Sequence, residues 1–212
     1  MSRIIVFGAG GRAGRAAVRQ ARDRGHRVTA VLRAPARHPD LSADGEVTVV
    51  PGDVTDADRV ADLAAGHDAV VHAAADLAAP PDVFFPAAAR ALLGGLGRAG
   101  VDRLLVVGLA SVLPTAAGVP LLDVPGYPQE YRTFCLGHGA GTEVLRRDGA
   151  AVDWLVLSPA GDFDHGGTPT GRYRFTPGEA TSRITYADLA VALLDEIETP
   201  RHRQLHLGVE RA

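Results

Sequence analysis

Glycine residues near the start of the chain form its clearest candidate site. They follow an apolar run at residues 4–7 and precede a segment whose alanines have helical spacing. Glycine lets the backbone turn tightly and approach a ligand, and a helix N-terminus presents free N–H groups and the positive end of its dipole. A strand, a glycine turn and a helix in this order predict a diphosphate-binding site; the alternative is an ordinary tight turn. The residues predicted to bind are Gly8, Gly10, Gly11, Arg12, Ala13 and Gly14.

Arg33 stands at the position that distinguishes the two nicotinamide dinucleotides. It follows the second predicted strand, residues 27–32, where NAD-specific sites usually carry an acid that binds the ribose hydroxyls. A guanidinium can bind the 2′-phosphate of NADP through its planar fork, whereas a carboxylate would repel that phosphate. We therefore expect NADP rather than NAD, with Arg12 and Arg37 adding positive charge. The alternative is that Arg33 is a solvated residue at a strand end.

Two later turns are expected to line the same cofactor. Asp53 and Val54 follow the third predicted strand, where a carboxylate and a backbone N–H can meet the adenine edge. Asp53 can equally well serve only to stabilise the turn. Ala73 and Ala74 follow the fourth predicted strand, and their small side chains would let a ribose lie close to the backbone. His72, just before them, is expected to be a buried, hydrogen-bonded histidine rather than a ligand.

Three polar side chains are candidates for catalysis. Ser111 has a hydroxyl that can donate a hydrogen bond to a substrate or to the nicotinamide amide, and the imidazole of His138 can donate a proton. Tyr131 can supply a hydroxyl or stack on a flat substrate. The alternatives are a cap at a strand end, a surface histidine and a packing tyrosine. The chain contains no lysine, which excludes Schiff-base chemistry and any tyrosine–lysine pair.

Two long segments without a regular pattern are expected to form the walls of a substrate pocket. Residues 108–128 and 158–183 are rich in proline and glycine, and long loops at the carboxyl end of a parallel sheet are usually functional. The residues predicted to line the pocket are Tyr127, Pro159, Ala160 and Phe163. No metal site is expected, because Asp162, Asp164 and His165 share one loop and have no distant set of ligands to complement them.

Apolar runs alternate with helical segments and supply the framework for these residues. Strands are predicted at residues 3–7, 27–32, 47–50, 69–72, 104–107, 152–157 and 204–209, and helices at about 12–24, 56–65, 83–99, 129–148 and 186–198. This alternation predicts an α/β fold, a Rossmann-like doubly wound parallel sheet in three α/β/α layers. Ligands then bind at the carboxyl ends of the strands. Capping-box patterns predict that Thr55 and Thr185 each begin a helix.

Length and composition exclude several other classes of function. A chain of 212 residues suffices for one α/β domain, so residues 1–212 are expected to form a single dinucleotide-binding domain. The net charge of −3 gives no reason to expect nucleic acid or an anionic membrane as a partner. No window reaches the ~20 apolar residues of a membrane helix. The single cysteine, Cys135, fits a reducing compartment. We expect a cytoplasmic monomer or homodimer that acts on a small molecule.

The order of these motifs resembles that of the atypical short-chain dehydrogenases. The matching residues are Gly8-x-x-Gly11-x-x-Gly14, Arg33-x-Pro35, Gly52-Asp53-Val54 and the run from Val106 to Ser111, with further matches at 143–146, 153–160, 171–174 and 182–190. The likeness covers nearly the whole chain and is greatest to the NmrA-like, NAD(P)H-flavin reductase and biliverdin-IX-beta reductase branch. It implies a Rossmann-like domain, NADP binding and the reduction of a flavin, quinone, tetrapyrrole or other conjugated substrate.

Within this resemblance, Ser111 matches the serine after the fifth strand, and His138 takes the place of a histidine that often faces the substrate. We therefore predict an NADPH-dependent oxidoreductase that transfers hydride to a flavin-like, quinone-like or conjugated carbonyl molecule. Such an acceptor can take its proton later from solvent, which fits the missing lysine. The alternatives are a redox-sensing regulator that binds NADP without turnover, and an isomerase or cyclase on the same fold. An open pocket beside Ser111 and His138 favours an enzyme, and one closed by residues 112–128 favours a sensor.

Overall fold

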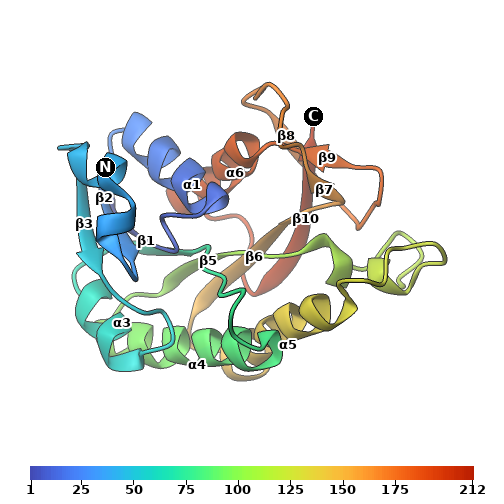
Figure 1. The fold of residues 1–212 in the computed structure, drawn as a ribbon, viewed down its shortest axis with the longest axis horizontal. Helices are drawn as coiled ribbons and strands as arrows, with labels where there is room; N and C mark the ends of the chain where they lie inside the picture. Colours follow the sequence, from blue (N-terminus) through green and yellow to red (C-terminus); the bar gives the residue numbers. More distant parts are fainter.

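Eight strands form one central sheet in the computed structural model, which describes residues 1–212 (Figure 1). The strand order is β3-β2-β1-β4-β5-β6-β10-β8. The strands are β1 (Arg3–Phe7), β2 (Arg27–Leu32), β3 (Val47–Pro51), β4 (Ala69–His72), β5 (Arg103–Val107), β6 (Asp153–Pro159), β8 (Tyr173–Thr176) and β10 (Leu205–Arg211). All neighbours are parallel except β8, which runs antiparallel to β10. The predicted Rossmann-like α/β fold is confirmed.

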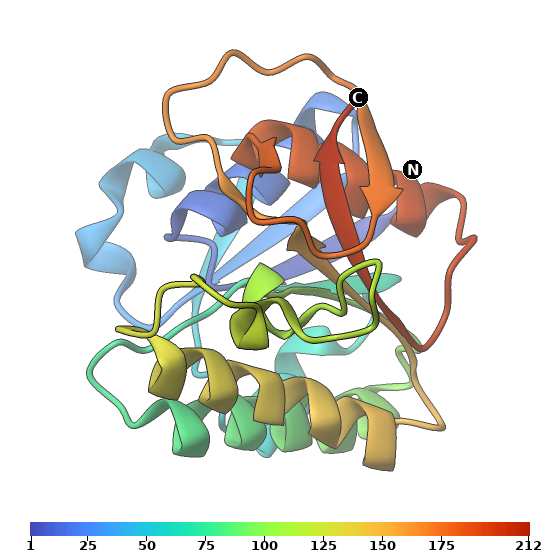
Figure 2. The same ribbon diagram turned by 90° about the vertical axis from the view of Figure 1, so that its right-hand side faces the viewer.

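Helices cover both faces of the sheet and give the molecule three layers (Figures 1 and 2). On one face lie α1 (Arg12–Asp23) and α6 (Tyr186–Glu198), and on the other lie α3 (Ala57–Ala64), α4 (Pro81–Ala99) and α5 (Arg132–Asp148). The shorter elements are η1 (Pro35–Arg37), α2 (Pro39–Ala43), η2 (Ala110–Val112), η3 (Leu121–Asp123), and the two-stranded sheet of β7 (Asp162–Phe163) and β9 (Arg183–Ile184). None of the helices combines the length and the apolarity that a membrane crossing requires.

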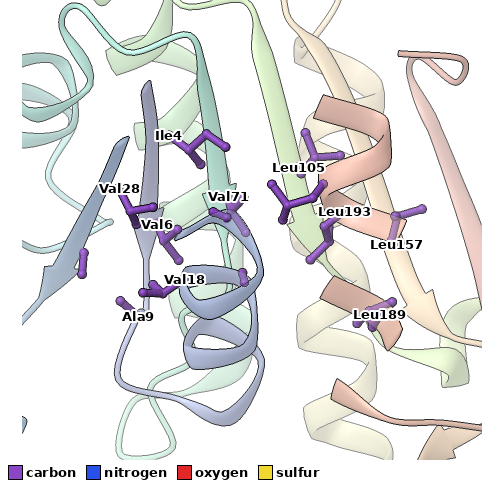
Figure 3. Packing of buried hydrophobic residues seen from close by; sticks show 14 of the residues in the cluster. Ile4, Val6, Ala9, Val18, Val28, Val71, Leu105, Leu157, Leu189 and Leu193 are labelled. Carbon is purple, nitrogen blue, oxygen red and sulfur yellow. The ribbon is translucent and has the colours of Figure 1, made fainter. Parts of the chain in front are cut away.

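Strand β1 shows how one buried strand supplies two cores. Successive side chains of a strand point to opposite faces, so a strand that is covered on both faces is apolar throughout. Ile4 and Val6 belong to the core beneath α1 and α6, and Figure 3 shows them in the same cluster as Val18 of α1. Ile5 and Phe7 belong to the core on the other face. These four side chains are at most 1% exposed, which makes the end of β1 a rigid base for the glycine turn.

Helix α5 packs closely on α4 because it presents glycines to that helix. A Cβ on Gly137 would lie 2.5 Å from the backbone of Pro81, and one on Gly141 would lie 3.0 Å from Phe85. The close approach sets the rotation of α5 about its own axis. It therefore also sets the direction of His138, which the helix carries between these two glycines.

The seven predicted strands and five predicted helices are all present, but two details of the prediction are wrong. Asp56, rather than Thr55, caps α3, and its carboxylate accepts hydrogen bonds from the N–H groups of Asp58 and Arg59. The hydroxyl of Thr55 instead donates to Asp53. The cap at Thr185 is confirmed, because its hydroxyl accepts the N–H of Asp188.

The second difference is strand β8, which lies inside the segment 158–183 that was expected to be irregular. Tyr173–Thr176 pairs with β10 from Gly208 to Arg211 and extends the sheet by one strand. The carboxylate of Asp188 holds the loop before this strand, because it accepts the N–H groups of Thr170 and Gly171. Only the remaining parts of 158–183 are free to form the wall of a pocket.

Candidate cofactor and substrate site

The glycine turn joins β1 to α1 in a conformation that leaves room for a ligand. Gly8 has φ +79°, and a Cβ at this residue would overlap the backbone of Ala74. Gly11 is the N-cap of α1, no side chain satisfies the first N–H groups of that helix, and its first turn carries no acid. Free N–H groups at the positive end of a helix dipole suit an anion. The turn therefore fits the diphosphate of a dinucleotide, and a side chain at Gly8 would push the turn away from the end of β4.

A cleft of about 530 Å³ opens from this turn along the carboxyl ends of β1, β2, β3 and β4. It brings together most of the residues that the sequence assigned to the cofactor: Gly8, Gly10, Gly11, Arg33, Asp53, Val54, Ala73 and Ala74. Further residues that line it are Phe7, Arg37, His38, Ala75 and Phe84. The cleft is elongated over four strand ends, which suits an extended nucleotide ligand.

Three residues assigned to the cofactor lie outside the lining of this cleft: Arg12, Ala13 and Gly14. A Cβ on Gly14 would overlap the carbonyl oxygen of Gly8, so Gly14 serves the close packing of α1 on the turn. Arg12 extends toward the segment after β7, where one guanidinium nitrogen is 3.1 Å from Nδ1 of His165. Ala13 is half-buried within the first turn of α1.

Arg33 and Asp53 both have partners within the protein. Arg33 forms an ion pair with Asp76, and its hydrogen bond holds the pKa of that carboxyl below the ordinary value. Asp53 accepts hydrogen bonds from the N–H and the hydroxyl of Thr55, at 2.9 Å and 2.8 Å. Asp53 therefore stabilises its turn and lines the cleft at the same time, so the two roles considered for it are compatible.

His38 is a cleft residue that the sequence did not indicate. It comes from the segment between β2 and β3, and its ring lies on the glycine turn, since a Cβ on Gly10 would be 2.5 Å from Nε2 of His38. Arg15 holds both parts together: it donates to the carbonyl of Gly10 at 3.0 Å, lies 3.1 Å from Nδ1 of His38, and pairs with Asp40. No motif marks this contact, because it depends on how the segment folds back.

A second cleft of about 630 Å³ lies at the carboxyl ends of β5 and β6. It brings together five predicted residues: Ser111, Tyr127, Tyr131, Pro159 and Phe163. Residues of 109–135 form one wall, and residues next to β7 and β9 form the other; Figure 2 shows these segments on the same side of the molecule. Additional lining residues include Phe134, Cys135, Asp162 and Arg183. Ala160 is fully buried and lies behind this wall, not in it.

Ser111 carries a buried polar group of the second cleft that has no partner inside the protein. Its side chain is 2% exposed, and its Oγ atom makes no hydrogen bond. Buried polar groups are nearly always hydrogen-bonded, so an unpaired hydroxyl at a cleft is available to a ligand. Tyr131, by contrast, is 72% exposed and stands at the rim. Burial raises the pKa of Tyr127, so this ring lines the cleft as a neutral phenol.

His138 does not line the second cleft. Its ring lies 4.2 Å from the ring of Phe85, between centroids, and with His72 it borders a separate cavity of about 20 Å³. Burial lowers the pKa of His138 to about 4 and that of His72 to about 3, so both imidazoles are neutral at pH 7. Their Nδ1 atoms have no partner, although His72 was expected to be hydrogen-bonded. A neutral ring outside the cleft is poorly suited to donate a proton to a substrate there.

Comparison with known proteins agrees with this geometry. A family model described as NAD(P)H-binding matches residues 8–200. "Uncharacterized protein YwnB" of Bacillus subtilis is 35% identical over 210 residues, which are 95% of this chain and 94% of that protein. A solved structure from Streptococcus pneumoniae, described as "a putative NADH-flavin reductase", is 27% identical with a TM-score of 0.80 over 100% of both chains. A "putative epimerase" from Bacteroides thetaiotaomicron is 30% identical with a TM-score of 0.86 over 99% of this chain and 97% of that one. The chain therefore belongs to the NAD(P)H-binding family, within the atypical short-chain dehydrogenases of NmrA-like type.

Proposed function

We propose that this protein is an NADPH-dependent reductase that transfers hydride to a flat conjugated molecule of flavin-like, quinone-like or conjugated carbonyl type. Family membership supports nicotinamide dinucleotide binding. The named reductase among the similar structures supports a redox reaction. The proposal concerns the substrate class and the reaction, which depend on the second cleft.

The observation that carries this proposal is the unpaired, buried hydroxyl of Ser111 in an aromatic cleft directly after β5. The cofactor cleft ends at the neighbouring strand β4, with Ala73, Ala74 and Ala75 in its wall. Ser111 therefore stands next to the strand end where the first cleft stops and the second begins. Ser111 lines the second cleft and His138 does not, but residues of the segment 112–128 line this cleft rather than fill it, which favours an enzyme over a sensor.

Each group of residues in the two clefts would have its own role in such a reaction. When bound, the nicotinamide cofactor supplies the hydride. The glycine turn would hold the diphosphate, Ala73 and Ala74 would leave room for a ribose, and Ser111 would donate a hydrogen bond that orients the acceptor. The rings of Tyr127 and Phe163 would cover a flat substrate and exclude water from it. No protein group needs to supply a proton, because a conjugated acceptor can take one from solvent after the hydride.

We propose NADPH rather than NADH because the cofactor cleft is basic at the end of β2. Arg33 and Arg37 line this end, and no carboxylate follows β2 directly. A planar guanidinium binds a phosphate monoester well, and a phosphate monoester distinguishes NADPH from NADH.

Turnover with model acceptors tests the proposal. The purified protein is mixed with NADPH or NADH, the absorbance of the reduced nicotinamide is followed, and FMN, a quinone or dichlorophenolindophenol is added. Faster consumption of NADPH than of NADH with at least one acceptor is expected. Tight binding of NADPH that no acceptor can oxidise would contradict the reductase and would favour a redox-sensing regulator or a non-redox enzyme.

A further inference from the structure

Arg33 and Asp76 connect two walls of the cofactor cleft. Arg33 follows β2, and Asp76 follows the alanines at the end of β4, so their ion pair crosses from one strand end to another. Both flanking segments, 31–34 and 73–75, line the cleft. Arg33 itself lines the cleft, and Asp76 comes directly after the lining residues of the other wall.

Asp76 is held in place for this contact. One of its oxygens accepts the N–H of Ala78 at 3.0 Å, which fixes the carboxylate in a tight turn, and the other faces Arg33. Its side chain is 20% exposed, whereas that of Arg33 is 55% exposed. The carboxylate is thus the fixed member of the pair, and the guanidinium is the member that can move.

The positive charge of the Arg33 guanidinium attracts a phosphate less strongly while the carboxylate of Asp76 is paired with it. Asp76 accepts a hydrogen bond from Nη1 of Arg33, which belongs to the planar fork that would bind a phosphate monoester, and a nearby carboxylate also repels the phosphate. Arg37, in the same wall, makes no ion pair or side-chain hydrogen bond, so only the charge of Arg33 is already compensated. A ribose without the phosphate meets no such competition.

We propose that Asp76 is a specificity-determining residue that competes with the 2′-phosphate of the cofactor for Arg33. Binding of NADPH replaces the Arg33–Asp76 pair by an Arg33–phosphate pair, whereas NADH binds without breaking it. Asp76 thereby lowers the preference for NADPH below the value that the basic residues alone would give. This inference rests on the proposed cofactor.

Equilibrium binding of NADPH and NADH, measured by nicotinamide fluorescence, tests the inference without reference to turnover. Asp76→Asn keeps an oxygen for the N–H of Ala78 but removes the charge, and we expect its Kd for NADPH to fall about fivefold. Its Kd for NADH should change less than about twofold. Asp58→Asn is the matched control, because it removes the acid of the exposed Arg98–Asp58 pair on α3 and α4, outside the lining of the cleft.

Combination with Arg33→Ala decides whether Asp76 acts through Arg33. In that background, Asp76→Asn should improve NADPH binding less than about twofold, because there is no guanidinium left to release. If Asp76→Asn raised the affinity for NADPH equally with and without Arg33, or in neither background, the proposed competition would be overturned. If the unmodified protein bound neither NADPH nor NADH, the proposed function would also be contradicted. If it bound both cofactors but Asp76→Asn did not change the affinity for NADPH, only the competition would be contradicted.

Discussion

The Oγ atom of Ser158 and the Nε2 atom of His206 lie 2.7 Å apart and share a hydrogen bond inside the protein. Ser158 is at the end of β6, and His206 is near the start of β10. Gly108, after β5, leaves the space for this bond, because a Cβ there would overlap Ser158 Oγ. Burial, followed by the charge of Arg146, lowers the pKa of His206 to about 3. The bond is therefore made by a neutral imidazole at physiological pH.

The first prediction is that acid destabilises the protein through this buried ring. An unfolded chain takes up a proton on a histidine below about pH 6.5, whereas folded His206 remains neutral until about pH 3. The stabilisation by the neutral ring is therefore complete above about pH 6.5 and is lost progressively as the pH falls toward 3. At pH 5 the loss from this one residue is about 2 kcal/mol.

Urea denaturation at pH 7 and pH 5 measures this effect. In His206→Gln, which keeps a hydrogen-bonding group near Ser158 but does not titrate, the free energy of unfolding should fall less between the two pH values. His165→Gln, at an exposed position, is the control and should behave as the unmodified protein does. An unchanged pH dependence in His206→Gln would show that the ring is accessible to protons in the folded state.

The second prediction uses two glycines with opposite surroundings. A Cβ on Gly14 would overlap the carbonyl oxygen of Gly8, so Gly14→Ala should lower the free energy of unfolding by about 3 kcal/mol. Gly94, in the middle of α4, has no atom within 4 Å of its Cβ position. Gly94→Ala should raise the free energy of unfolding by about 0.5 to 1 kcal/mol. Equal effects of the two substitutions would show that α1 does not pack on the turn as described.

The third prediction concerns Ser111. Ser111→Ala should lower kcat/KM for the acceptor by about tenfold to a hundredfold, because it removes the hydroxyl that orients the substrate. NADPH affinity should stay the same, and stability should not fall, since Oγ has no hydrogen bond to lose inside the protein. Ser182→Ala is the matched control: Ser182 is also buried and unpaired but does not line the cleft. A comparable loss of activity in both variants would remove Ser111 from its assigned role.

The fourth prediction concerns the cofactor phosphate. Arg33→Asp should raise the Kd for NADPH by about tenfold or more, because it replaces a phosphate-binding cation with an anion beside Asp76. The Kd for NADH should change much less, which calorimetry of both cofactors can show. Arg98→Asp, on the outer surface of α4, controls for the change in net charge. An equal loss of affinity for both cofactors would mean that Arg33 contacts a part that they share.

The sequence predicted the framework well because strand and helix patterns here agree with the tertiary structure. Apolar runs such as residues 4–7 are buried on both faces, which makes them unambiguous. Strand β8 was missed because its four residues gain strand geometry from pairing with β10, far along the chain. Asp56 displaced Thr55 as the cap of α3, a difference of one residue that the local pattern does not resolve.

The candidate site was predictable where it depends on backbone and on strand ends. The glycine turn and Arg33 line the cofactor cleft because their places follow from the strand order. Side-chain directions on α5 were not predictable, since they depend on how its glycines pack on α4; His138 therefore borders an inner cavity instead of the substrate cleft. The contact of Asp76 with Arg33 was not predicted, because the two residues are 43 positions apart in the sequence. An acid directly after the three alanines that follow β4 was the one sign of this contact in the sequence.

The most direct test of hydride transfer in this site uses NADPH that carries deuterium on one face or the other of nicotinamide C4. A protein that holds the cofactor in one orientation removes hydride from one face only. After turnover with the best acceptor, mass spectrometry of the NADP⁺ should show complete loss of deuterium from one labelled cofactor and complete retention from the other. Partial retention from both, or the same result without protein, would contradict the account of this chain as an NADPH-dependent reductase.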